Sequence, residues 1–321
     1  MNLESQPLAP PPLHDSRGYR AWRSAKLRQF EQARGLPRLE LSSLAPSDRE
    51  LRALWDALES TNMVLVRLYD PAAVTAEAML ALGQRLGLKT LDHNPCADQQ
   101  AVSRLENRSA PLEQQGDQQG GQLGGQRGGE YIPYTDRALG WHTDGYYNPP
   151  EAAVRAWMLF CVRPAASGGE NALLDPELAY LWLRDRDPAL IDALMHPQAF
   201  CIPANRHDGK EQRPRTCGPV FALRDRRLLM RFSARGRNID WHPGAESARA
   251  ALGELFSSDS DFILRHKLSA GEGYITRNVL HTRAAFADGP GAGRLLLRVR
   301  YRDALVRAGE GVQLKQRTTS A

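Results

Sequence analysis

The sequence predicts a mainly β fold, a β-sandwich or jelly-roll barrel decorated by flanking helices. One observation behind this is a series of short apolar runs, separated by turn residues, that fills most of the chain after residue 130. Another is the small number of helical patterns, several of which open on a recognisable start signal. The chain has 321 residues, 42% of them hydrophobic, which is enough to bury a large core.

The first ninety residues are predicted to form a helix, a strand and a second helix. Ser47, followed three residues later by Glu50, forms a capping-box pattern that marks the start of a helix. Residues 63–69 alternate apolar side chains, as a half-buried strand does. The second amphipathic helix is expected to begin at Thr75.

Two segments do not have the pattern of a packed domain. Residues 1–20 are proline-rich and polar, and we expect a flexible N-terminal tail there. The remaining residues, 21–321, are expected to form a single domain. Within it, residues 113–129 are rich in Gly and Gln and have almost no apolar side chains, which indicates either a mobile lid or a disordered insertion.

After residue 130 short strands predominate. The candidate strands are 152–163, 218–223, 227–233, 262–268, 273–280 and 294–302. Helices are expected to start at Asp175-Pro176 and Asp187-Pro188, because Asp suits the cap and Pro the first helical position. A further helix is predicted at 246–256.

Composition restricts the location and the partners of the protein. No apolar run reaches eighteen residues and the N-terminus lacks a secretory pattern, so we expect a cytoplasmic protein with no membrane partner. The four scattered cysteines are then expected to be reduced thiols. Residues 206–237 contain ten basic and three acidic residues, a surplus that could face an anionic partner or simply water.

The strongest chemical motif is Trp141-His142-Thr143-Asp144-Gly145. On a strand, His142 and Asp144 would point to the same face and could bind adjacent positions of one metal ion. Two histidines and one carboxylate form the facial triad of non-haem Fe(II) oxygenases. His281, in a second motif far along the chain, is the candidate for the third ligand.

Two arginines follow His281 on one predicted strand. Arg294 and Arg298 are four residues apart and therefore share a face, so both could point into the barrel. A buried arginine is costly unless it meets an anion, and its planar fork fits a carboxylate. This pattern predicts an acidic cosubstrate or substrate beside the metal.

Together these motifs resemble the taurine dioxygenase-like (TauD/TfdA-type) branch of the Fe(II)/2-oxoglutarate-dependent dioxygenases. The resemblance rests on WHTDG, the Gly168-Gly169-Glu170 turn, the HTRAAF stretch and the closing arginines, and covers residues 130–303. It implies a double-stranded β-helix, the clavaminate synthase-like jelly roll. It also implies that His142, Asp144 and His281 bind Fe(II).

The resemblance assigns further roles residue by residue. Arg294 matches the arginine that binds the distal carboxylate of 2-oxoglutarate, and Arg298 matches one that binds acidic substrates. Asn171 stands where the family often has a cosubstrate-binding Thr, and its amide can still donate. Tyr147 is at a position that often lines the substrate pocket.

The implied activity is hydroxylation of a small substrate, acidic or amino-acid-like, using O₂ and releasing succinate and CO₂. Asp144 favours hydroxylation because halogenating members replace this carboxylate. One alternative is a non-oxidative, cupin-like metal enzyme, which leaves Arg294 unexplained. The other is a basic nucleic-acid-binding protein, which the absence of any recognition motif disfavours. A homo-oligomer remains compatible with the sequence.

Overall fold

Two β-sheets form the centre of the molecule. The computed structural model describes residues 10–33, 35–93, 101–108, 132–207, 210–236 and 239–307. The six-stranded sheet has the order β1 (Arg38–Leu41), β2 (Met63–Leu68), β16 (Glu272–Thr276), β5 (Ala156–Arg163), β19 (Leu295–Tyr301) and β3 (Val102–Leu105). The four-stranded sheet has the order β15 (Leu264–His266), β7 (Asn171–Leu174), β17 (Leu280–Arg283) and β4 (Leu139–His142).

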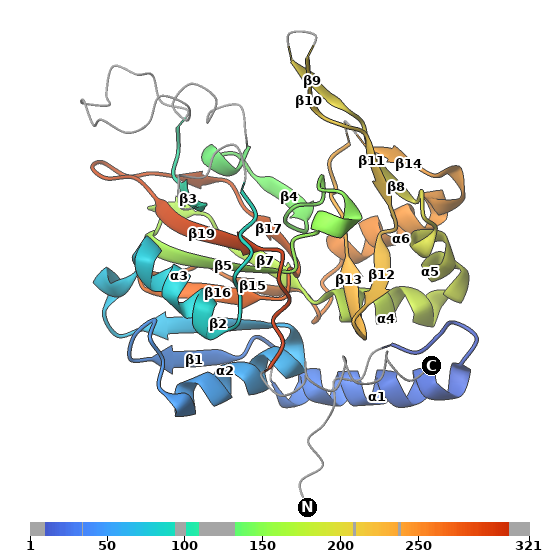
Figure 1. The fold of residues 1–321 in the computed structure, drawn as a ribbon, viewed down its shortest axis with the longest axis horizontal. Coiled ribbons are helices and arrows are strands. Elements are labelled where there is room, and N and C mark those ends of the chain that lie inside the picture. The colour runs from blue at the N-terminus through green and yellow to red at the C-terminus, as the bar shows by residue number, and fades with distance from the viewer. Residues whose placement is uncertain are drawn as a thin grey trace, which may run out of the picture.

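In the part of the chain that the structure describes, six α-helices lie over or beside these sheets (Figure 1). They are α1 (Ser16–Gln32), α2 (Asp48–Thr61), α3 (Ala76–Arg85), α4 (Pro176–Arg186), α5 (Pro188–Met195) and α6 (Glu246–Ser257). Short 3₁₀ turns lie at Pro71–Ala73, Ile132–Tyr134, Pro150–Ala152 and Pro243–Ala245.

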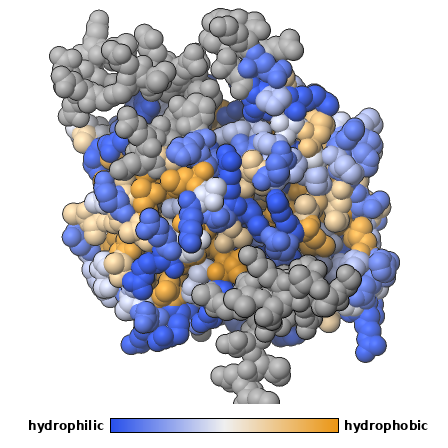
Figure 2. Space-filling model, viewed as in Figure 1, coloured by the Kyte–Doolittle hydropathy of each residue, from blue (hydrophilic) through white to orange (hydrophobic). Residues whose placement is uncertain are grey.

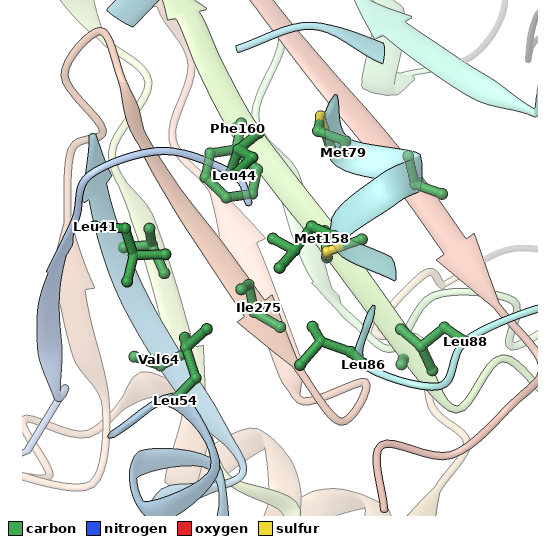
Figure 3. Packing of buried hydrophobic residues seen from close by; sticks show 14 of the residues in the cluster. Leu41, Leu44, Leu54, Val64, Met79, Leu86, Leu88, Met158, Phe160 and Ile275 are labelled. Carbon is green, nitrogen blue, oxygen red and sulfur yellow. The ribbon is translucent and has the colours of Figure 1, made fainter. Parts of the chain in front are cut away.

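The outer face of the six-stranded sheet is covered by α2 and α3. Leu54 and Leu58 of α2 and Met79 of α3 belong to one buried cluster with Met158 and Phe160 of β5 (Figure 3). The inner face packs toward the four-stranded sheet, because Leu159 and Trp157 of β5 share a second cluster with Leu173 of β7. The apolar alternation of these strands therefore fills both sides of the sheet.

A third apolar cluster lies beside the two sheets, in the long connection between β7 and β15. It contains α4, α5 and α6 together with small sheets, and it forms the right-hand half of Figure 1.

The remaining strands are β8 (Phe200–Ile202), β9 (Asn205–His207), β10 (Lys210–Arg213), β11 (Thr216–Gly218), β12 (Phe221–Arg224), β13 (Arg227–Met230), β14 (Asp240–Trp241), β6 (Ser167–Gly168) and β18 (Phe286–Ala287).

This connection also covers the free edge of β4. Phe232 accepts a backbone hydrogen bond from Thr143 at 3.0 Å, and Ala234 donates one to Trp141 at 2.7 Å. Between them Ser233 forms an antiparallel bridge with His142. The segment 232–234 thus holds β4 from the side opposite to β17.

The predicted helix starts are confirmed. Ser47 and Glu50 form both bonds of the capping box at α2, and Thr75 caps α3. Asp175 and Asp187 cap α4 and α5, each followed by proline. Short polar side chains at these positions satisfy amide groups that have no partner inside the helix.

The prediction of a flexible tail over residues 1–20 was wrong for residues 10–20, which belong to the folded part of the chain. Helix α1 begins at Ser16 and buries Trp22. Before it, the Arg184 guanidinium donates hydrogen bonds to the carbonyls of Pro11, Pro12 and Leu13. Residues 1–9, and the 113–129 segment predicted as a lid or insertion, lie outside the described residues.

Two of the cysteines correct another expectation. Cys201 and Cys217 are register partners on β8 and β11 and form a disulfide, whereas Cys161 is a buried free thiol. Cys96 lies outside the described residues. The expectation of reduced thiols was therefore wrong for this pair.

The surface of the described residues has few large apolar side chains in contact with water. Only Tyr69 (73% exposed) and Leu223 (46%) stand out among them. On the face shown in Figure 2, hydrophobic and hydrophilic residues are interspersed. Within the described ranges, no helix has the length and apolar character needed to cross a bilayer.

Candidate metal centre

His142, Asp144 and His281 come together at one end of the four-stranded sheet. Each offers a ligand atom, and these atoms lie within 4.8 Å of one another. The pairing of β4 with β17 explains the meeting, because His142 and His281 are direct register partners. Opposite residues of an antiparallel pair point to the same face. Their rings are 4.1 Å apart between centroids.

Both histidines have the tautomer that a metal needs. His142 Nδ1 lies 2.9 Å from the Gly140 carbonyl and His281 Nδ1 3.0 Å from the Val279 carbonyl. A carbonyl can only accept, so each Nδ1 carries the proton and each Nε2 keeps a free lone pair. Burial lowers the pKa of His142 to about 3 and also lowers the pKa of His281, which favours neutral rings.

Asp144 is the candidate for the anionic ligand. Its Oδ1 accepts a hydrogen bond from Arg298 Nη1 at 3.0 Å, while its Oδ2 is buried without a hydrogen-bond partner. Burial opposes the charge, but Arg298 and Arg300 hold the pKa of Asp144 well below its usual value. An ionised oxygen with no partner, beside two free imidazole nitrogens, fits a divalent metal ion.

The strand predicted to carry both first-motif ligands is shorter than expected. β4 ends at His142, and Asp144 lies in the turn that follows. Gly145 takes a positive φ of 66°, and a Cβ there would lie 2.4 Å from the Val154 side chain. The turn therefore requires glycine at this position.

Arg294 is buried immediately before strand β19. It is 4% exposed, and its Nη1 has no hydrogen-bond partner. Its guanidinium lies over the Phe286 ring at 4.9 Å, and burial lowers its pKa to about 10. A buried cation with a free N–H is typical of a site that receives an anion.

Asn171 is buried nearby on β7, but no hydrogen bond joins it to Arg294. Its Nδ2 donates to the Thr282 carbonyl at 3.3 Å, and its Oδ1 is buried without a partner. Asn171 is a register partner of Arg283, whose guanidinium also lies over Phe286 at 4.9 Å. Asn171 and Arg294, the two residues predicted to bind the cosubstrate, therefore lie in one region of the two-sheet sandwich.

Arg298 contacts Asp144 directly, whereas Tyr147 is joined to the metal centre through Arg300, which the sequence motifs did not single out. Arg300 Nη1 donates to Tyr147 Oη at 3.0 Å and lies 3.7 Å from Asp144 Oδ1. Its Nη2 pairs with Asp92 at 2.6 Å. Arg300 is two residues after Arg298, so strand alternation alone places it on the same face.

The basic segment is largely bonded within the protein. Arg227 pairs with Glu59 and Arg215 with Asp240, and Arg231 donates to the carbonyls of Phe200 and Thr216. These contacts give Arg215, Arg227 and Arg231 a structural use. They lend no support to the nucleic-acid alternative.

Comparison with known proteins decides the family. The model of the "Taurine catabolism dioxygenase TauD, TfdA family" matches residues 23–300. The chain belongs to this family. The resemblance predicted from the motifs is thereby confirmed, and Fe(II), 2-oxoglutarate and O₂ are the cofactors that TauD/TfdA enzymes use.

Individual relatives agree with the TauD/TfdA assignment. A uridine-5′-phosphate dioxygenase from Streptomyces sp is 32% identical over 174 residues, which cover 51% of this chain and 62% of that protein. Two structures of the non-heme iron oxygenase OrfP share the fold. The one in complex with Fe and alpha-ketoglutaric acid has a TM-score of 0.51, 19% identity and coverage of 88% and 92%. The other has a TM-score of 0.53, 16% identity and coverage of 90% and 96%.

Proposed function

We propose that this TauD/TfdA-family chain is an Fe(II)- and 2-oxoglutarate-dependent dioxygenase in which His142, Asp144 and His281 bind the iron. The observation that carries the proposal is that His142, Asp144 and His281 each bring one ligand atom to within 4.8 Å of the others, while one oxygen of Asp144 is buried without a hydrogen-bond partner. Three ligands on one face leave positions for a cosubstrate and O₂.

We propose further that the two sheets form a double-stranded β-helix within a single domain that also includes helix α1 and the segment before it. Its eight strands in chain order would be β3, β4, β5, β7, β15, β16, β17 and β19. The first, eighth, third and sixth are neighbours in one sheet, and the second, seventh, fourth and fifth in the other. This alternation is that of a jelly roll.

Arg294 is proposed to bind the distal carboxylate of 2-oxoglutarate, with Asn171 as a second donor. Arg294 has a free buried N–H, and an arginine fork matches a carboxylate. When bound, iron and 2-oxoglutarate supply the oxidising chemistry, with succinate and CO₂ as products. The chain supplies orientation and a water-poor site, since His142, Asp144 and Arg294 are all less than a tenth exposed.

The substrate is proposed to be a small molecule with an acidic group near Arg298, Arg300 and Tyr147. Arg298 and Arg300 both have a buried Nε without a hydrogen-bond partner. Asp144 is one of their counter-charges, and a metal ion would draw on the same carboxylate. An anionic group on the substrate would then compensate the positive charges of Arg298 and Arg300. The Streptomyces relative is named for a phosphate ester, which fits this class.

Succinate release tests this substrate class. We expect Fe(II)-loaded protein with 2-oxoglutarate and O₂ to release succinate faster when a small acid, an amino acid or a nucleoside monophosphate from a panel is the substrate. Neutral analogues of the active compound should be poor substrates, because they leave Arg298 and Arg300 unmatched. Stimulation by neutral compounds alone would contradict the proposed class.

Replacing Arg294 with alanine is expected to weaken 2-oxoglutarate binding by roughly 10- to 100-fold, the loss of a charged hydrogen-bonding partner. The measurement is the visible charge-transfer band that forms when Fe(II) and 2-oxoglutarate are mixed anaerobically with the protein. Iron binding without cosubstrate should be unchanged.

Arg163→Ala is the matched control for this measurement. Arg163 ends the adjacent strand β5, and its Nε already donates to the Gly293 carbonyl at 3.0 Å, so it is not proposed to bind the cosubstrate. The Arg163→Ala variant should form the charge-transfer band at the same 2-oxoglutarate concentration as the wild type. Equal behaviour of the two variants would remove Arg294 from the cosubstrate site and favour a metal enzyme that does not use a keto acid.

A further inference from the structure

The side chain of Asn278 forms hydrogen bonds with the main chain of Asp144. Its Oδ1 accepts a hydrogen bond from the Asp144 amide at 2.8 Å, and its Nδ2 donates to the Asp144 carbonyl at 3.0 Å. The same Nδ2 donates to the Val154 carbonyl at 2.7 Å. Asn278 is 7% exposed, so water cannot easily replace these bonds.

These hydrogen bonds hold a part of the main chain that lies beyond the end of the sheet pairing. The pairing of β4 with β17 ends at His142 and His281, and Asp144 lies beyond it. No strand partner in the described residues therefore holds the main chain of Asp144 on this side. Asn278, three residues before His281, makes the two bonds that a neighbouring strand would otherwise make.

The backbone of Asn278 is itself firmly placed. Its φ is 52°, a left-handed conformation that asparagine tolerates better than most residues. The preceding Arg277 donates its amide to the Asn62 carbonyl, and its guanidinium to the carbonyls of Leu58 and Leu305. The turn that carries Asn278 is thus anchored to α2 and to the end of the chain's described part.

We infer that Asn278 is a positioning residue that sets Asp144 relative to His281. It connects two ligand-bearing segments that are far apart in sequence, through contacts with the main chain rather than with the carboxylate. The inference rests on the iron site proposed above. Loss of a residue that orients a metal ligand typically lowers metal affinity by about 10- to 100-fold.

The test is the Asn278→Gly variant, because glycine accepts the positive φ and removes only the amide side chain. Fe(II) affinity is measured by anaerobic titration, and thermal unfolding is followed on the metal-free protein. We expect Fe(II) binding to weaken by about 10- to 100-fold. Asn278→Asp provides a second variant if the glycine form does not fold, since a carboxylate cannot donate to the two carbonyls. It should weaken binding as well.

Asn62→Gly is the matched control. Asn62 has a φ of 59° and is 9% exposed, and its Nδ2 donates to Asp175 Oδ1 at 3.0 Å. Its Oδ1 accepts from Arg277 at 3.3 Å, but glycine keeps the Asn62 carbonyl that accepts the Arg277 amide, so the main-chain anchor of the Asn278 turn remains. It should lower thermal stability but leave the Fe(II) affinity within about twofold of wild type, well inside the effect of a lost orienting residue.

The outcomes separate the inference from the proposed function. Wild-type affinity in both Asn278 variants would overturn the inference while leaving the iron site intact. An equal loss of affinity in Asn62→Gly would also overturn it, because general loosening would then explain the effect. If the wild-type protein itself binds no Fe(II), the proposed function fails.

Discussion

Asp144→Ala is expected to abolish iron binding and to lower the free energy of unfolding of the metal-free protein by about 3–5 kcal/mol. The carboxylate is a proposed ligand and also the counter-charge of two buried guanidinium groups, at 3.0 Å from Arg298 and 3.7 Å from Arg300. Its removal leaves these cations with Asp92 as the only carboxylate that the described contacts give them. Urea unfolding and anaerobic Fe(II) titration measure the two effects.

His281→Ala separates the two roles of the site. It removes a proposed iron ligand but no counter-charge, so iron binding should be lost with a smaller loss of stability than in Asp144→Ala. The centroid of the His281 ring lies 4.7 Å from that of Trp157, so removing the ring should leave a cavity that lowers the free energy of unfolding. If the two variants were equally destabilised, the charge balance assigned to Asp144 would be incorrect.

Lys26→Met is expected to lower the free energy of unfolding by about 3–5 kcal/mol. Lys26 is 4% exposed, and its Nζ lies 2.6 Å from Asp175 Oδ2 and 2.5 Å from Glu177 Oε2. Burial would lower the pKa of Lys26, but the two carboxylates together raise it. Methionine fills the space yet leaves both acids without their cation. The start of α4 favours negative charge and offsets part of this cost.

Arg23, also on α1, forms a surface ion pair with Asp185 of α4 and is the control for Lys26. Arg23 lies 2.7 Å from Asp185, with side chains 40% and 31% exposed, and Arg23→Ala should cost less than about 1 kcal/mol. Both variants are compared by urea unfolding at pH 7. Because the pKa of Lys26 is raised in the folded protein, its stabilisation is present below the unfolded value of about 10.4 and is lost only above it. Similar losses in the two variants would mean that burial of Lys26 has little effect.

The sequence was most informative where a local rule determines local structure. Ser47, Thr75, Asp175 and Asp187 each begin a helix as predicted, because a cap depends on only three or four neighbouring residues. Helix α1 was missed although Asp15 caps it locally, and the segment before it is held by Arg184 of helix α4. No pattern within residues 1–20 reveals that contact.

The candidate site shows the same division. His142, Asp144 and His281 were named from motifs, and the structure brings their ligand atoms together. Arg300 could have been found by extending the alternation used for Arg298 by two residues. Asn278 could not, because its value lies in three bonds to the main chain of distant segments, and these depend on the register of the folded sheets.

The segment 232–234 along β4 has a consequence for misfolding. β4 would otherwise be an edge strand, open to addition of another chain or to slippage of its pairing. A slip of one residue would turn His142 away from His281 and separate the two imidazoles. The bonds from Phe232 and Ala234 to either side of His142 resist both events. A stretch that provides no candidate ligand thus protects the protein from assembling the proposed iron site in the wrong register.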